Sequence, residues 1–264
     1  MINLFRKTRK KMADDNRPIK PAWPAGRYAR YAIGEIVLVV IGILIALSIN
    51  NWNENRKNKL AESKYYCKLL ADFELDRKNV LKLSKESDYK IETSKKLLLE
   101  LNKKNKDKSF LIDGYIQALR TNIFVPSKVT ITDIISSGKL NLLTNDSLKN
   151  DLIRYYTELD KLLYQLEINR SKSLEKAFSY DDDIQLGHQY ADYAKKSLGN
   201  EILESLPKNN WQFDSNSKYF KQFQNDLVFF VRMSEREKQH FDNILTEMES
   251  TYNQLKKVCG SNQK

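Results

Sequence analysis

The chain has little of the residues that build cross-linked, metal-bound or turn-rich folds. Its 264 residues include only two cysteines, two histidines, eight glycines and five prolines. Two cysteines exclude a disulfide framework, and a four-ligand zinc site would need both cysteines and both histidines to converge. Scarce glycine and proline, with plentiful Lys, Leu, Asn and Glu, predict long helices and argue against a many-stranded sheet.

Motifs for catalysis and nucleotide binding are also missing. The sequence contains no GxGxxG, GxxxxGK[ST], GxSxG or HExxH pattern. Its many carboxylates stand at charge-pair spacings, as in Glu62/Lys64 and Glu235/Lys238, and we expect them on helix exteriors. We therefore expect that the protein is not an enzyme. No catalytic, cofactor-binding or metal-binding residue and no small-molecule substrate is identified.

The positive charge is concentrated near the N-terminus. The chain has a net charge of +11, and residues 1–30 contain nine Lys and Arg against two Asp, a net charge of +7. A strongly basic chain often binds nucleic acid, but here most of the excess belongs to a short tail before an apolar run. We expect no nucleic-acid partner.

One long apolar run predicts a transmembrane helix. Residues 36–49 read IVLVVIGILIALSI and carry no charge, and the full span, residues 31–52, adds the carboxylate Glu35. About twenty helical residues cross a bilayer core of about 30 Å. Tyr31 and Trp52 stand at the two ends, where aromatic rings favour the headgroup layer. The lipid bilayer is therefore a predicted partner.

The charge asymmetry around this span predicts its direction. Because cytoplasmic flanks carry an excess of Lys and Arg, we expect residues 1–30 to be a basic cytoplasmic tail. Residues 53–264 then form an extracytoplasmic domain, periplasmic in a Gram-negative cell, on a single-pass protein of the inner (plasma) membrane. A cleaved signal peptide is the alternative, since Ala46-Leu47-Ser48 fits a small-x-small cleavage site. Both hypotheses place the domain outside the cytoplasm.

Two features of the span leave alternatives open. Glu35 is either a functional group inside the membrane or an interfacial carboxylate near Arg30. Gly42-x-x-x-Ala46 would let a second helix approach closely, although such pairs also arise by chance.

The patterns after the span predict an all-α fold, a helical bundle with long coiled-coil-like helices. Residues 54–105 show apolar side chains at 3–4 spacing, interrupted at Asp76 and then shifted in frame. Thr144-Asn145-Asp146 caps a second helix that runs to about Phe178. A third pattern, residues 220–258, continues the 3–4 alternation through twelve positions, nine of them apolar, and demands a partner helix.

Shorter elements are expected between the long helices. Residues 110–124 predict an amphipathic helix that ends before Pro126, and residues 130–137 predict a short helix closed by a glycine. Asp181-Asp182-Asp183 does not match the ligand spacing of an EF-hand and indicates a solvated loop. Residues 188–213 are ambiguous.

We expect the helix after residue 54 and the final helix to pack antiparallel. The first leaves the bilayer at Trp52, and the last, at about 58 Å for 39 residues, is long enough to return. This arrangement would bring Cys67 and Cys259 within disulfide range, and an oxidising compartment would favour the bond. The alternative is that both thiols are small buried apolar groups.

A family resemblance rests on the membrane segment. The stretch YAIGEIVLVVIGILIALSINNWNE, residues 31–54, resembles the signature of a bacterial family of uncharacterised single-pass membrane proteins, catalogued as a domain of unknown function. The segment from Phe124-x-Pro126 to Ser137-Gly138-Lys139-Leu140, and then residues 151–156, are similar to its soluble part. The resemblance covers most of the chain apart from residues 18–26. It implies an inner-membrane anchor and no catalytic residues.

Two classes of function follow. The first is a membrane-anchored helical interaction or scaffold module of the cell envelope, with a protein partner or a second copy of the chain. The alternative is an extracytoplasmic ligand-sensing helical bundle that signals through a separate partner, since the short tail carries no output domain. A nucleic-acid binder is supported only by the basic composition.

Overall fold

A computed structural model of the protein describes residues 25–179 and 182–261. The expected basic tail therefore lies, up to residue 24, outside the described residues, and so does Asp181 of the acidic loop. The described residues form seven α-helices and three 3-10 helices, with no strand among them. The predicted all-α class is confirmed.

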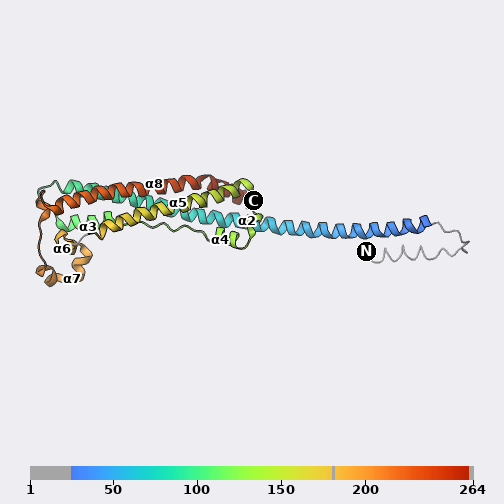
Figure 1. Ribbon diagram of the computed structural model, residues 1–264, viewed down its shortest axis with the longest axis horizontal. Helices are drawn as coiled ribbons and strands as arrows, with labels where there is room; N and C mark the ends of the chain where they lie inside the picture. Colours follow the sequence, from blue (N-terminus) through green and yellow to red (C-terminus); the bar gives the residue numbers. More distant parts are fainter. Residues whose placement is uncertain (1–24, 180–181, 262–264) are drawn as a thin grey trace, which may run out of the picture. The chain divides into compact units, whose positions relative to one another are not determined.

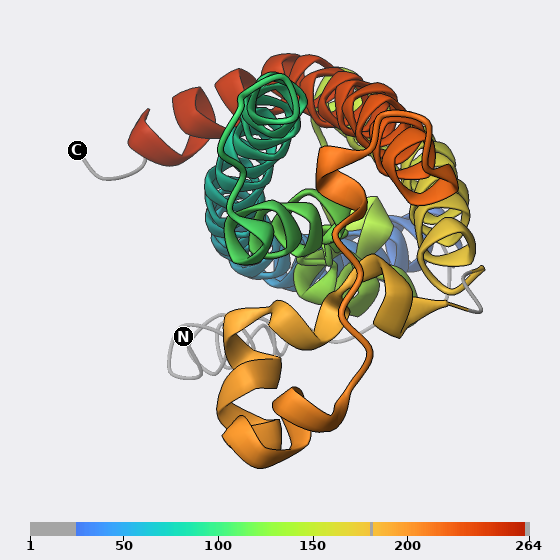
Figure 2. The ribbon, with the colours of Figure 1, turned by 90° about the vertical axis from the view of Figure 1, so that its left-hand side faces the viewer.

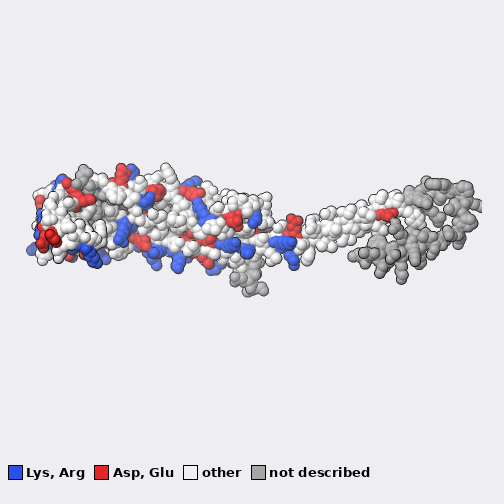
Figure 3. Space-filling view, turned by 90° about the horizontal axis from the view of Figure 1, so that it is seen from below, with Lys and Arg blue, Asp and Glu red and all other residues white. Residues whose placement is uncertain are grey.

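The chain divides into two compact units, Met1–Lys57 and Asn58–Lys264, here called the N-terminal unit and the bundle unit. Helix α2 (Ala25–Glu100) contributes residues to both. In the N-terminal unit, every large apolar side chain from Tyr31 to Ile49 is exposed. Figure 3 shows this stretch as an almost unbroken white surface, whereas the bundle unit is covered with charged side chains of both signs. This helix is long and apolar enough to cross a membrane.

The first and last helices of the bundle unit run in opposite directions. Helix α8 (Lys218–Ser261) contacts the part of α2 that begins at Asn58. Cys67 pairs with Cys259, Ser84 with Asp242 and Lys90 with Glu237, so the residue numbers fall along α8 as they rise along α2. The predicted antiparallel pair is thus present (Figure 1).

The third long helix, α5 (Asp146–Ala177), runs parallel to α2. Thr144, just before α5, donates to Glu62 of α2, and farther along the rings of Tyr155 and Phe73 pack at a tilt with centroids 4.6 Å apart. Two parallel neighbours require a connection that returns the chain to its starting end. Residues 101–145 are that connection, and in Figure 2 they lie between α2 and α5.

The returning connection is only partly helical. It contains α3 (Lys108–Leu119), α4 (Val129–Ser136) and the 3-10 helix η1 (Lys139–Leu142). Residues 120–128, here called the strap, have no regular structure.

The predicted helix over residues 110–124 was therefore wrong in its last five residues, 120–124. The chain leaves the helix at Arg120, with φ −54° and ψ 138°, because Ile123 and Val125 are β-branched and Pro126 excludes helix before it. The short helix after Pro126 is confirmed to within one residue, and Gly138 ends it at φ 68°, a left-handed conformation that suits glycine.

Two apolar clusters fill the bundle unit. The first joins α2, α5, α8 and the strap, whose Phe124 is 7% exposed between the helices. In the second, the ring of Tyr115 of α3 packs against Phe223 and Phe230 of α8, and Trp211 packs against Phe223. These phenylalanines belong to the stripe of the last helix, whose apolar positions are core.

Residues 183–213 form an insert between α5 and α8, and the sequence left residues 188–213 of it ambiguous. Its elements are α6 (Asp183–Leu186), η2 (His188–Tyr190), α7 (Asp192–Ser205) and η3 (Trp211–Phe213). Trp211 packs against Phe223 of α8, with ring centroids 5.0 Å apart, and within the insert its indole Nε1–H donates to the carbonyl of Leu186 at 2.7 Å. Helix α7 buries none of its residues, is interrupted at Gly199, and stands apart from the three long helices in Figure 2.

The stripes of the long helices include polar residues. All twelve positions of the stripe over residues 220–258 pack inward, among them the polar Ser234, Glu237 and Thr251. In α2 the predicted shift of frame was wrong, because the stripe continues through four buried polar residues, Ser84, Ser87, Lys90 and Ser94. The helix also ends at Glu100, five residues earlier than predicted.

A disulfide joins Cys67 of α2 to Cys259 of α8, with the Cα atoms 5.3 Å apart. Of the two hypotheses for these cysteines, the structure therefore adopts the bonded one. The bond closes a loop between residues 192 positions apart in the sequence. It fastens the last turns of α8 to the start of the bundle unit.

Removal of this bond should destabilise the bundle unit. Replacing both cysteines by serine should lower the free energy of unfolding by about 2–5 kcal/mol, because the unfolded chain regains the freedom that the closed loop removed. Urea denaturation of the detergent-solubilised chain, followed by circular dichroism, measures the change. Dithiothreitol should reproduce the loss in the parent chain and leave the double variant unaffected; an unchanged parent midpoint in dithiothreitol would contradict the bond.

Candidate functional site

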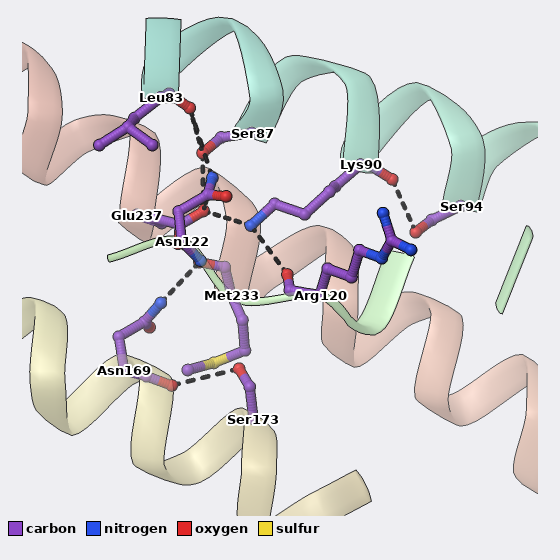
Figure 4. Close-up of polar contacts among 10 residues, drawn as sticks. All are labelled: Leu83, Ser87, Lys90, Ser94, Arg120, Asn122, Asn169, Ser173, Met233 and Glu237. Carbon is purple, nitrogen blue, oxygen red and sulfur yellow. Dashed lines mark hydrogen bonds and ion pairs between the residues drawn. The ribbon is translucent and has the colours of Figure 1, made fainter. Parts of the chain in front are cut away.

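The most concentrated polar site of the bundle unit is a buried ion pair. Lys90 of α2 and Glu237 of α8 form it, and both side chains are only 7% exposed (Figure 4). Ser87, one helical turn before Lys90, donates from its hydroxyl to Glu237 at 2.7 Å. Lys90 also donates to the carbonyl of Arg120 at 3.2 Å. A buried charge pair is tolerated only when its remaining hydrogen-bonding capacity is satisfied, and here it is.

The strap supplies the other partners of this carboxylate. The backbone N–H of Asn122 donates to Glu237 at 3.2 Å, and the Asn122 side-chain amide donates to the other carboxylate oxygen at 3.3 Å. The same amide reaches the carbonyl of Leu83 at 3.5 Å. Because the strap is not helical, several of its backbone groups take their partners from side chains of α2 and α8. The ion pair thus fixes the start of the strap.

A small polar cavity lies next to the ion pair, on the side of α5. Asn169 donates to the carbonyl of Met233 at 3.0 Å, and Ser173 donates to the carbonyl of Asn169 at 3.1 Å (Figure 4). Together with Lys90 and Glu237 these side chains line a space of about 10 Å³. That volume is the size of a single water molecule.

Two carboxylates of α2 hold the other end of the strap. Asp76 accepts from the backbone N–H of Ser127 at 2.8 Å, and Asp72 accepts from the Ser127 hydroxyl at 2.8 Å and from the N–H of Thr130 at 3.2 Å. Burial raises the pKa of Asp76 to about 6; the Ser127 N–H opposes this shift, and the nearby charge of Asp72 adds to it. The strap is therefore held at both ends by buried ionisable groups.

A third polar cluster attaches the insert to α3. Lys108 donates to the carbonyl of Asn209, and its ammonium group stands 5.0 Å from the centroid of the Tyr190 ring. Burial lowers the pKa of Lys108 to about 8. Nearby, burial lowers the pKa of His188, while Asp183, 3.3 Å away, opposes the shift.

The residues considered for a zinc site do not converge. Cys67 and Cys259 bind each other, and His188 and His240 lie on different elements, η2 and α8. Within the described ranges, no group of three or more His, Cys, Asp or Glu side chains has the arrangement of a metal site.

Sequence reasoning missed the buried carboxylates. They were expected on helix exteriors, but Asp76 is 2% exposed, Asp226 is fully buried, and Glu237 is 5% exposed. The signal was available, because Asp76 and Glu237 fall at positions of the 3–4 stripes where an apolar side chain is expected. A carboxylate at such a position indicates a buried partner, here the strap.

The functional capacity of these clusters is structural. Each of them joins a helix to a non-helical segment, and their charged groups contact carbonyls, backbone N–H groups or opposite charges. These polar clusters position the strap and the insert.

The comparisons with known proteins give one match. Residues 35–184 match a family described as a family of unknown function (DUF6090). The matched range includes the apolar stretch of α2, the strap with Asp72, Asp76 and Lys90, and all of α5. No curated protein and no solved structure matches the chain.

Breaking the buried ion pair should be costly. Lys90→Met or Glu237→Gln should each lower the free energy of unfolding by about 3–5 kcal/mol, because either leaves a buried charge without its partner. Urea denaturation measures the loss. The control is Lys161→Met, which breaks an exposed pair with Glu158 and should cost less than about 1 kcal/mol. Equal losses in the buried and exposed variants would contradict the assigned role of Lys90 and Glu237.

Because the pKa of Asp76 is raised, we expect the chain to be more stable at acidic pH than at neutral pH. Between its ordinary value of 3.8 and about 6, the folded chain holds more protons at Asp76 than the unfolded chain, so stability falls as the pH rises through this window. Relative to Asp76→Asn, the parent should lose at most about 3 kcal/mol across it. The measurement is urea denaturation at several pH values. His188 and His240, whose pKa values are lowered, are common to both proteins and cancel in the difference. A difference that does not change with pH would contradict the assignment.

Proposed function

Because this chain belongs to the family of unknown function DUF6090, we propose a function from its own structure: a membrane-anchored helical interaction module of the cell envelope. In this proposal the N-terminal unit crosses the inner membrane once, and the bundle unit lies outside the cytoplasm and binds protein. The proposal includes no catalytic activity and no nucleic-acid partner.

The observation that carries the proposal is the exposed apolar surface of α2. From Tyr31 to Ile49 its large apolar side chains are 46–63% exposed, on every face of the helix. At about 25 cal/mol per Å² of apolar surface, such a helix is strongly favoured in lipid over water. Glu35, near one end of this stretch, fits an interfacial carboxylate as well as a functional group.

Two independent features support the side of the membrane. Residues 1–30 carry a net charge of +7, which favours the cytoplasm for the N-terminus. The disulfide between Cys67 and Cys259 favours an oxidising compartment for the bundle unit, because thiols in the bacterial cytoplasm are kept reduced. Both features agree on an extracytoplasmic bundle unit.

The interior of the bundle unit favours interaction over ligand sensing. Inside the bundle, the space beside Asn169 measures about 10 Å³, far below the 300–1,000 Å³ that is usual for a small-molecule pocket, so any partner would bind at the surface. The buried charges hold the strap in place, so the outer surfaces of the helices carry the recognition.

Proximity labelling in the native cell tests the proposal. A peroxidase fused to the C-terminus should label extracytoplasmic proteins and should reproducibly enrich a small set of envelope proteins. The peroxidase reports the side of the membrane and the neighbours of the bundle unit in one measurement.

The matched control is the peroxidase fused directly after residue 57, which keeps the N-terminal unit and removes the bundle unit. It should label the same compartment without enriching the same set. Labelling of cytoplasmic proteins would overturn the orientation, and identical sets from both fusions would overturn the interaction role.

A further inference from the structure

A groove on the surface of the bundle unit combines positive charge with an apolar floor. It has a volume of about 560 Å³ and lies along α2, with one residue of α8 on its edge. Its lining residues are Glu74, Arg77, Lys78, Leu81, Lys82, Lys85 and Tyr252. Four of these seven residues are basic and one is acidic, so the groove has a net charge of +3.

The spacing of the basic residues gives the groove a direction. Lys78 and Lys82 are one helical turn apart, and Lys85 follows after three more residues. At 1.5 Å per residue, Arg77 to Lys85 extends about 12 Å along the axis of α2. The positive charge therefore forms a line along the helix, and a ligand that matches it must be elongated.

These cations are poorly neutralised. Lys82 has one partner, Glu86 at 3.7 Å, and both side chains are exposed. Arg77 stands over the Tyr252 ring, 5.8 Å from its centroid. Among the described residues, Lys78 and Lys85 form no ion pair with a carboxylate.

The outer face of α5 shows the opposite arrangement. There, basic residues pair with carboxylates three positions away, at distances of 2.6–2.8 Å: Lys149 with Asp146, Lys161 with Glu158, Arg170 with Glu167 and Lys172 with Glu175. Basic residues are thus paired on α5, whereas the groove keeps a net charge of +3, which is complementary to an anionic partner.

The floor of the groove is apolar. Leu81 is 38% exposed and lies between the cations, and the Tyr252 ring closes the side toward α8. A simple anion such as phosphate would leave this surface in water. A ligand that covers it needs an apolar side chain between its negative charges.

We propose that this groove binds an acidic amphipathic helix of a partner protein. Such a helix, laid along α2, presents carboxylates one turn apart at the same rise as Lys78, Lys82 and Lys85, and an apolar residue between them covers Leu81. A lipid headgroup, which gathers its charge at one point, matches a line of cations less well. The inference rests on the proposed interaction function and names the partner class.

A synthetic helical peptide of about fifteen residues tests the groove directly. It carries Glu at one-turn intervals and Leu between them, with a fluorescent label, and anisotropy measures its affinity for the full-length chain in detergent. The triple variant Lys78→Glu, Lys82→Glu, Lys85→Glu should weaken binding by at least about tenfold, and raised salt should weaken binding to the parent. The peptide with Asn in place of Leu should bind less tightly.

The control variant has the same change in net charge at exposed sites elsewhere: Lys95→Glu, Lys161→Glu, Lys172→Glu. It should bind the peptide within about twofold of the parent. Circular dichroism establishes that both triple variants fold, since substitutions of exposed side chains have small effects on stability.

Three results would overturn the inference: no binding of the peptide by the parent, equal weakening in both triple variants, or binding only to vesicles of equal parts phosphatidylglycerol and phosphatidylcholine. The proposed function is tested separately, because proximity labelling requires no particular groove. If proximity labelling succeeds and the peptide does not bind, the proposal about the groove is wrong and the proposed interaction function still stands.

Discussion

The buried carboxylate of Glu237 connects α8 to α2 and to the strap, because it accepts from Ser87, Lys90 and Asn122 together. Its burial is possible only while all three segments are in place, since an unpaired charge in an apolar core costs several kcal/mol. The contact therefore couples three parts of the chain that are far apart in the sequence. It makes the register of α8 on α2 depend on the strap, and the position of the strap depend on both helices.

The need for such charges follows from the topology. Parallel α2 and α5 require a return connection, and a strap with β-branched residues and Pro126 cannot return as a helix. Its backbone groups then lack helical partners, and Asp76 and Lys90 of α2 and Glu237 of α8 supply them. These buried polar residues in the helical stripes are therefore present because they bind the backbone of the non-helical strap. Phe124 of the strap adds an apolar contact, because its side chain packs in the cluster that joins α2, α5 and α8.

The outer surface follows a different rule from the interior. On α5, charges of opposite sign pair along the helix and leave little field to attract a partner. Along the groove of α2, Lys78 and Lys85 contribute positive charge over an apolar floor, which is suited to recognition. A membrane anchor would confine this groove to one compartment and raise the frequency of encounters with partners in the same membrane.

Local periodicity and composition were enough to predict four features. These are the apolar stretch of α2, the stripe of α8, the Asn145 cap of α5 and the all-α class. These are recognisable because side chains at 3–4 spacing share one face of a helix whatever they pack against. Only the tertiary structure decided the parallel placement of α5, the strap and the burial of Asp76, Lys90 and Glu237. A charged residue in a stripe is exposed or buried according to the partner opposite it, and that partner, the strap, lies far away in the chain. The disulfide was decided in the same way, because two cysteines 192 positions apart meet only when α8 returns along α2.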